Sequence, residues 1–265
     1  TTLFRSALQI AATGMSAQQM RVDVVSNNLA NMSTTGYNAR RADFADLHYQ
    51  QLARPGTIAA EDGTMLPTGV QMGLGVRPAA ISVVLAQGTL SATGGDLDLA
   101  IEGQGYLEVT MPSGGSAYTR DGALKRTGDG LIVTSDGHPV APGLTIPSDA
   151  RSVSINANGE VYAYFDGQVE PQQLGQLNLV GFTNEKGLEA IGSNLFLESP
   201  ASGPPMVGTA GADGLGMLRQ GYLEESSVDA VREVTELIKA QRGYELNAKV
   251  ITAADQMLSA TTQVR

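Results

Sequence analysis

Residues 3–31 read LFRSALQIAATGMSAQQMRVDVVSNNLAN, and this stretch decides the fold class. Apolar side chains recur in it every seven residues, at Leu8, Met15, Val22 and Leu29. Such an interval places them along one face of a helix, and a sustained period of seven is typical of helices that wrap around one another. Asn31 and Gly36 supply a stop signal, so the pattern predicts a helix over 3–31.

The other end of the chain carries a second segment of the same kind. Ser226 and Asp229 resemble a capping box, after which helix is expected almost to the last residue. Apolar side chains again recur at seven, namely Leu237, Tyr244, Ile251 and Leu258. The two ends are therefore expected to form a coiled-coil-like helical hairpin.

The surface of the first helix is unusually poor in charge. Its first 31 residues hold only Arg5, Arg21 and Asp23 as charged side chains. Two ordinary amphipathic helices packed on a globular core are one explanation of the stripes. A face buried against sister subunits explains the lack of charge better, because solvated helix faces are normally charged. We therefore expect both ends to be completed by neighbouring copies, and to be frayed in the free chain.

Glycine and proline divide the chain into three parts. All 11 prolines lie within 55–205, and 30 of the 32 glycines lie within 36–221. Short β-like runs such as 131–134, 153–155, 161–165 and 177–180 alternate there with Asp-Gly turns. The prediction is an α+β chain with an inserted, acidic, all-β domain. The expected divisions are an N-terminal helix in 1–35, an extended connector in 36–75, the β domain in 76–225 and a C-terminal helix in 226–265.

Composition excludes several classes of function. The chain has 265 residues, no cysteine, two histidines and a net charge of −10. Thiolate chemistry, disulfides and histidine-rich metal sites are therefore not expected, and an acidic chain is a poor nucleic-acid binder. There is no apolar run long enough to span a membrane and no secretory signal at the start, so no membrane insertion is expected.

Motifs for catalysis are absent. Gly-x-Gly fragments at 73–75 and 103–105 lack the later glycine of a dinucleotide loop. Asp96 and Asp98 could share one side of a strand, but nothing else converges on them. His48 and His138 are interpreted as surface residues. We therefore expect no catalytic residue, no metal and no cofactor.

Several short segments resemble the signatures of one family, the axial proteins of the bacterial flagellum, which are rod and hook subunits. The N-terminal signature covers 28–31, 35–37, Arg41 and Phe44. The central ones are 97–106 and 118–122, and the C-terminal ones are 221–224, 228–229 and 241–245. The resemblance covers both ends and the centre in order. The chain departs from the family at Ser227, where asparagine is usual, at 106–107, where two phenylalanines are usual, and at Gly243, where alanine is usual.

Within that family, the connector resembles the distal rod subunits, which carry an insertion absent from the hook protein. The residues that carry this likeness are Tyr49, Arg54, Pro55, Gly56, Leu66 and Pro67. In that family the insertion is held to make the rod straight and stiff.

The resemblance implies a non-enzymatic subunit that polymerises helically in the rod spanning the periplasm and transmits torque to the hook. Its implied partners are further copies of itself, other rod and hook subunits, the surrounding L and P ring proteins and the flagellar type III export apparatus. The implied assembly residues are the eight stripe residues named above with Asn31, Gly36, Tyr37, Gln241 and Arg242. A proximal rod or hook subunit is the alternative within the family, and a secreted β-rich carbohydrate-binding protein or enzyme is the remote one.

Overall fold

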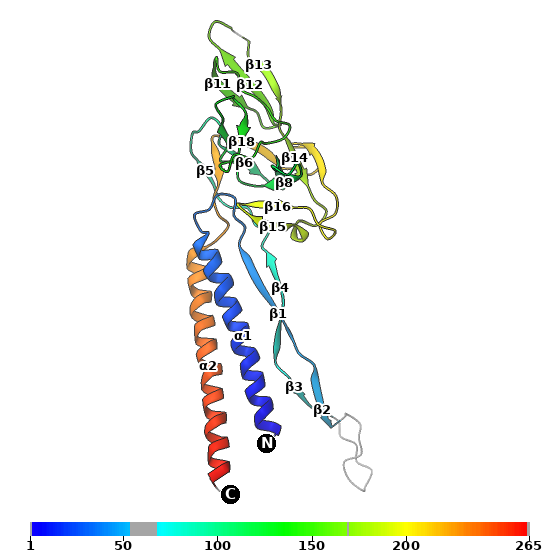
Figure 1. The fold of residues 1–265 in the computed structure, drawn as a ribbon, viewed down its shortest axis with the longest axis vertical. Coiled ribbons are helices and arrows are strands. Elements are labelled where there is room, and N and C mark those ends of the chain that lie inside the picture. Colours follow the sequence, from blue (N-terminus) through cyan, green and yellow to red (C-terminus); the bar gives the residue numbers. More distant parts are fainter. Residues whose placement is uncertain (1, 54–67, 169, 264–265) are drawn as a thin grey trace. The chain divides into compact units, whose positions relative to one another are not determined.

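The computed structural model describes residues 2–53, 68–168 and 170–263 (Figure 1). In these residues two long α-helices accompany nineteen β-strands, so the predicted α+β class is confirmed. The chain divides into two compact units. One, the helical unit, comprises Thr1–Leu29, Arg40–Ser82 and Ala230–Arg265; the other, the β unit, comprises Ala30–Ala39 and Val83–Asp229.

The helical unit is built on α1 (Thr2–Ala30) and α2 (Ala230–Gln263). Residues late in α1 contact residues early in α2, and residues in the first half of α1 contact residues in the second half of α2. The two helices therefore run antiparallel and side by side (Figure 1). Asn28 near the end of α1 donates a hydrogen bond to Glu233 near the start of α2, at 3.1 Å. Gly14, in the first half of α1, faces Asn247, in the second half of α2.

A two-stranded ribbon completes the helical unit. It consists of two paired segments, β1 with β4 and β2 with β3. Their bounds are β1 (Arg40–Asp46), β2 (Tyr49–Ala53), β3 (Val70–Gly73) and β4 (Val76–Val83). The range predicted as an extended connector thus forms paired strands where it is described. This pairing was not predicted, because most of β2 and β4 is exposed and therefore lacks the apolar alternation of a half-buried strand.

Two polar side chains of α1 hold the ribbon. The amide of Asn28 forms two hydrogen bonds with the backbone of Arg40, accepting from its N–H at 2.9 Å and donating to its carbonyl at 2.8 Å. The hydroxyl of Thr13 accepts a hydrogen bond from the N–H of Val76 at 3.3 Å. Gly75 passes so close to Thr13 that a Cβ atom there would lie 2.2 Å from the hydroxyl oxygen. Position 75 therefore requires glycine.

The β unit contains the remaining strands. A six-stranded antiparallel sheet has the order β15-β16-β8-β7-β14-β17, and a three-stranded one has the order β11-β12-β13. The strands of the larger sheet are β7 (Tyr106–Thr110), β8 (Ser116–Thr119), β14 (Asn178–Gly181), β15 (Glu189–Gly192), β16 (Leu195–Leu197) and β17 (Met206–Thr209). Those of the smaller sheet are β11 (Ala150–Ile155), β12 (Glu160–Phe165) and β13 (Gln172–Gln176).

Three further pairs belong to the same unit, and the first two of them join segments far apart in the sequence. β18 pairs with β6, β19 with β5 and β10 with β9, all antiparallel. The strands are β5 (Leu90–Ala92), β6 (Leu99–Glu102), β9 (Lys125–Arg126), β10 (Ile132–Val133), β18 (Met217–Gln220) and β19 (Tyr222–Glu224), with one short 3₁₀ helix, η1 (Glu185–Gly187). The last strands before α2 therefore return to the first strands of the unit.

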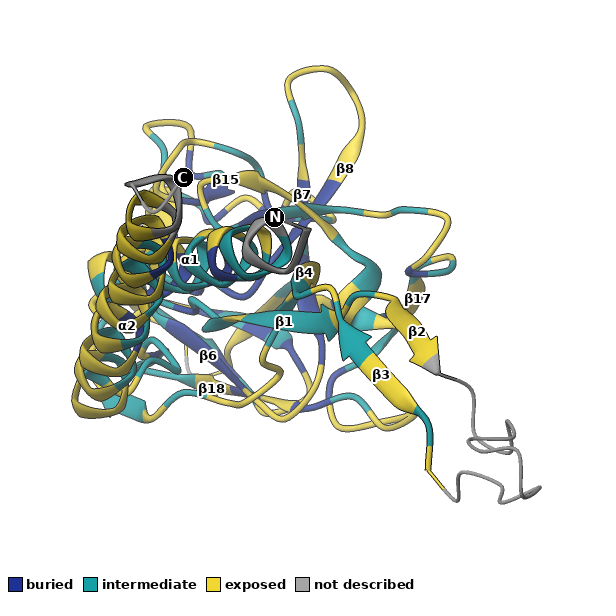
Figure 2. Cartoon of the chain, turned by 90° about the horizontal axis from the view of Figure 1, so that it is seen from below, coloured by how far each residue is buried: buried dark blue, intermediate teal, exposed yellow. Residues whose placement is uncertain are grey.

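The core lies in the β unit, where apolar strand faces meet. Its fully buried large side chains include Leu99, Ile101, Leu107, Val161, Leu177 and Leu179. A second cluster is aromatic, with Tyr106 and Tyr118 packed edge-on against Phe182. In the helical unit the buried apolar side chains are smaller, namely Ala11, Ala17, Val24, Val25, Ala240 and Ala254. Figure 2 colours buried positions of α1 dark blue.

Asp-Gly turns were predicted at 121–122, 129–130 and 136–137, and the last two are confirmed. Gly130 and Gly137 have φ angles of 86° and 87° and close tight turns. Gly122 differs, because its φ is not positive and its backbone lies against that of Leu99, whose carbonyl oxygen would be 1.5 Å from an added Cβ atom. Glycine is needed there because two backbone segments approach closely, and not because the chain makes a hairpin turn.

Candidate assembly surfaces and a buried junction

The predicted stripe of α1 is only partly buried. Leu8, Met15, Val22 and Leu29 are all half-buried. The positions that meet α2 or are most buried are small or polar, among them Ala11, Gly14, Gln18, Val25 and Asn28. Val22 follows Gln18 by four residues, and Leu29 follows Val25 by four, which places each only about 40° further round the helix. The stripe therefore borders the contact with α2, and its role in assembly stays a prediction.

The stripe of α2 is also only partly covered. Leu237 and Ile251 are half-buried, Tyr244 is 44 % exposed, and the side chain of Leu258 lies outside the described residues. Gln241 and Arg242 are exposed. The most buried positions of α2 are Ala240 and Ala254. Each helix has the other as partner along a narrow seam, and frayed ends in the free chain stay a prediction.

A larger apolar surface lies elsewhere on α2. Figure 2 draws much of this helix in yellow, the colour of exposed residues. Val231 is 78 % exposed and Leu246 is 62 % exposed. The other exposed large apolar side chains of this helix are Val234, Ile238, Val250 and Met257. They were not among the predicted assembly residues, because the longer seven-residue series at Leu237, Tyr244, Ile251 and Leu258 was taken as the stripe. So many exposed apolar groups on one helix mark an interaction surface.

The predicted insertion is described only at its edges. Tyr49 begins β2 and is 56 % exposed. Arg54, Pro55, Gly56, Leu66 and Pro67 lie outside the described residues. Ala53 pairs with Val70 across the ribbon, so the strands that flank the insertion are paired up to its edges.

A buried ion pair joins two of the segments that resemble the family, 118–122 and 221–224. The guanidinium of Arg120 and the carboxylate of Glu224 meet at 2.9 Å, with side-chain exposures of only 7 % and 3 %. Arg120 also donates to the backbone carbonyls of Gly103, at 3.0 Å, and Gly105, at 3.1 Å. The second carboxylate oxygen of Glu224 accepts from the N–H of Gly88, at 3.0 Å. Hydrogen bonds thus satisfy both charges, as a buried pair requires.

The N-terminal signature joins the same junction through its backbone. The N–H of Gly36 donates to the carbonyl of Glu224 at 2.8 Å. Next to it, the N–H of Ser227 donates to the carbonyl of Tyr37, and its hydroxyl accepts from the N–H of Ala39. Ser227 therefore ties the segment before α2 to the segment 37–39. Asn31 and Tyr37 are half-buried, and Gly36 is buried.

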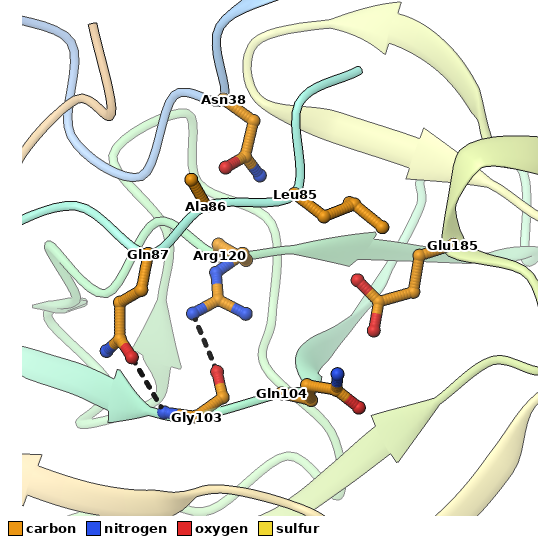
Figure 3. A pocket seen from close by; sticks show the side chains of 8 residues that line it. All are labelled: Asn38, Leu85, Ala86, Gln87, Gly103, Gln104, Arg120 and Glu185. Atoms are coloured by element: carbon orange, nitrogen blue, oxygen red, sulfur yellow. Dashed lines mark hydrogen bonds between the residues drawn. The ribbon is translucent and has the colours of Figure 1, made fainter. Parts of the chain in front are cut away.

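Figure 3 shows a pocket of about 170 Å³ beside this ion pair. Arg120 reaches the carbonyl of Gly103, and the amide oxygen of Gln87 accepts from the N–H of the same glycine at 3.1 Å. Asn38, Gln104 and Glu185 also line the pocket. Glu185 accepts a hydrogen bond from the hydroxyl of Tyr106, whose pKa is raised well above its ordinary value mainly by burial. The polar side chains of Arg120, Gln87 and Glu185 at this pocket are thus hydrogen-bonded to other groups of the chain.

Both Asp98 and Asp96 take part in structural hydrogen bonds, the first through its carboxylate and the second through its backbone. Asp98 accepts a hydrogen bond from the hydroxyl of Thr93, and the backbone carbonyl of Asp96 accepts one from Gln220. Burial, with the nearby charges of Asp136 and Asp98, raises the pKa of Asp121. In the part of the chain that the structure describes, no group of three or more metal-binding side chains gathers at one place. Across the same residues, no helix is long and apolar enough to cross a membrane.

Comparison with known proteins gives the family. The chain is 52% identical to the flagellar basal-body rod protein FlgG of Caulobacter vibrioides, over 98% of this chain and 99% of that one. It is 46% identical to FlgG of Agrobacterium fabrum, over 96% and 97%. The chain belongs to the flagellar rod and hook protein family. Three family models agree: flagella basal body rod protein at 8–38, flagellar hook protein FlgE/F/G D1 domain at 100–163 and flagellar basal body rod FlgEFG protein C-terminal at 219–264.

Flagellar rod and hook proteins are structural subunits and not enzymes, in agreement with the absence of catalytic motifs noted above. A solved structure, that of the flagellar hook protein FlgE2 of Helicobacter pylori, is 14% identical to this chain. Its TM-score is 0.24, covering 70% of this chain and 43% of that one, and so low a score carries no argument. Arg120 and Glu224 lie in two segments that resembled the rod and hook family, but sequence alone did not pair them.

Gly36 should be among the least replaceable residues of this rod-family chain. Its φ of 66° disfavours any other residue, and an added Cβ atom would lie 2.9 Å from the carbonyl of Arg120. Gly94 is a matched control, with a φ of 70° and open space around its Cβ position. We expect Gly94→Ala to cost about 1 kcal/mol of unfolding free energy and Gly36→Ala at least about twice that. Urea unfolding of both variants measures the difference, and equal losses would contradict the tight junction.

Proposed function

We propose that the chain is a structural subunit of the flagellar distal rod, which self-assembles into a stiff helical tube and transmits motor torque across the periplasm to the hook. The likeness to basal-body rod proteins over nearly the whole of both chains carries this proposal. A subunit of this kind must present surfaces that other copies complete, and α2 carries such a surface.

In this proposal the two terminal helices, in 1–35 and 226–265, form a coiled-coil-like hairpin in the inner layer of the tube. The inserted β domain, in 76–225, forms the outer layer, and 36–75 is the connector with its distal-rod insertion. The uneven distribution of acidic and basic residues along the chain supports this arrangement. Between the nearly neutral ends, the segment 48–227 holds 19 of the 27 acidic residues but only eight of the 17 basic ones.

The surfaces for self-assembly would include the exposed side chains of α2 and the half-buried stripes. A surface patch that meets a different patch on the next copy produces an open helical polymer, as a rod requires. The assembly residues predicted from the sequence belong to this proposal, with Gly36 and Asn31 acting through the fold rather than by direct contact.

The further partners are other rod proteins, hook subunits, the L and P ring proteins and the flagellar export apparatus. An acidic outer layer would repel acidic ring surfaces and so discourage adhesion to them. A proximal rod or hook identity remains the competing proposal, and the insertion separates the two.

Electron microscopy of the purified chain under assembly conditions tests the proposal. The expected result is straight tubes, and a deletion of 54–67 is expected to make them bend. The ribbon suits this deletion, because Ala53 pairs with Val70 and the remaining Thr68 and Gly69 can form a two-residue hairpin turn. The persistence length of the tubes is the quantity measured, and we expect it to fall several-fold.

The control replaces 54–67 with a Gly/Ser segment of the same length, which keeps the connection but not its sequence. Tubes that bend in both variants assign stiffness to the insertion itself. Straight tubes in both would reject the distal-rod proposal in favour of another rod-like identity. Absence of any polymer from the unaltered chain would reject self-assembly.

A further inference from the structure

Two side-chain amides in the contact between α1 and α2 each face a glycine of the other helix. Gln18 of α1 lies against Gly243 of α2, where an added Cβ atom would be 3.0 Å from the amide carbon. Asn247 of α2 lies against Gly14 of α1, where an added Cβ atom would be 2.9 Å from the amide nitrogen. Both amides therefore occupy space that the missing side chains leave open.

The two contacts are reciprocal. Each helix carries a glycine followed four residues later by an amide, GMSAQ at 14–18 and GYELN at 243–247. Four residues span about one turn, so the glycine and the amide lie on one face. Because the helices are antiparallel, the glycine of each meets the amide of the other. Gly243, the departure from the family noted above, is half of this arrangement.

One of the amide oxygens lacks a hydrogen-bond donor. The side-chain oxygen of Gln18 is buried and accepts no hydrogen bond within the described residues. A buried acceptor without a donor destabilises a fold, so an apolar side chain would be the more stabilising choice here. A polar side chain in a helix seam is known to specify how helices pair while lowering stability.

The alternative pairing is plain from the surfaces of both helices. Apolar packing alone would favour a rotation of α2 that brings exposed apolar groups such as Leu246 and Val234 against the half-buried stripe of α1. That arrangement would bury on one chain the groups that now face outwards. In it, neither amide would face a glycine.

We propose that the reciprocal amide–glycine contacts fix which faces of α1 and α2 meet and the register of one helix along the other. They thereby keep the apolar faces available to other copies. The first part concerns a single chain and does not depend on the proposed function. The second part rests on that function. An experiment on the free chain tests the pairing alone, so failure of assembly and failure of the pairing are distinguishable.

Spin labels on the full-length chain report the pairing. The chain has no cysteine, so Ser16→Cys and Lys249→Cys place labels at two exposed positions, one on each helix. Double electron–electron resonance on frozen free chain should give one narrow distance distribution. With Gln18→Leu and Asn247→Leu added, we expect a second population displaced by about 5 Å or more, because turning or sliding a helix about 10 Å wide moves its surface that far.

Gln19→Leu is the matched control, since Gln19 is exposed and adjacent to Gln18 in sequence. It should keep the single distance. Gln18→Leu alone is measured as well, with helix content by circular dichroism, in case the double variant loses structure. A single, unshifted distance in both amide variants would overturn the proposal, and so would a broad distribution in the chain with native amides.

Discussion

Replacing Arg120 with alanine should lower the free energy of unfolding of the β unit by about 3–5 kcal/mol. The substitution leaves the carboxylate of Glu224 buried, without its partner at 2.9 Å. It also removes the donors to the carbonyls of Gly103 and Gly105. Breaking a buried pair on one side costs far more than the pair contributes, because the remaining charge stays out of water.

Denaturant unfolding followed by fluorescence or circular dichroism measures the loss. Arg151→Ala is the control, because Arg151 pairs with Asp166 at 3.4 Å with exposures of 76 % and 83 %, and exposed pairs contribute at most about 1 kcal/mol. Removing both charges, as Arg120→Met with Glu224→Leu, should recover part of the stability. A loss as small as that of Arg151→Ala would refute the central role of the junction.

The junction illustrates what sequence could predict and what it could not. The segments containing Gly36, Gly103, Arg120 and Glu224 all stood out by their resemblance to a family. Their meeting at one ion pair depends on β19 returning to β5 and on β18 returning to β6, pairings that join residues more than a hundred positions apart. Local patterns carry no information about such partners.

The helices illustrate a different limit. Their existence followed from the apolar period and the scarcity of breakers, and their ends fell within a few residues of the prediction. The small and polar residues at the contact were not predicted, because we selected the largest apolar side chains of each helix. Gly14 lies against Asn247 and Ala240 is fully buried, and such small side chains let two backbones approach.

Leu246→Glu should abolish assembly while leaving the free chain folded. Leu246 is 62 % exposed, and leucine and glutamate have similar helix propensities. In the free chain the new carboxylate would lie four residues after Arg242 and three before Lys249, where it gains weak favourable pairs. The fold should therefore change in stability by less than about 0.5 kcal/mol.

In the polymer the same carboxylate would be buried against another copy, at a cost of several kcal/mol for each subunit. Because each 1.4 kcal/mol is a factor of ten, the critical concentration for assembly should rise by roughly 100-fold or more. Sedimentation of polymer across a concentration series measures it, with circular dichroism and size-exclusion chromatography on the free chain. Leu246→Met is the matched control, since it keeps the apolar bulk and should assemble normally. Assembly of Leu246→Glu at the unaltered concentration would mean that this face of α2 stays in water within the polymer, and the assembly surface would have to be sought among the half-buried stripes instead.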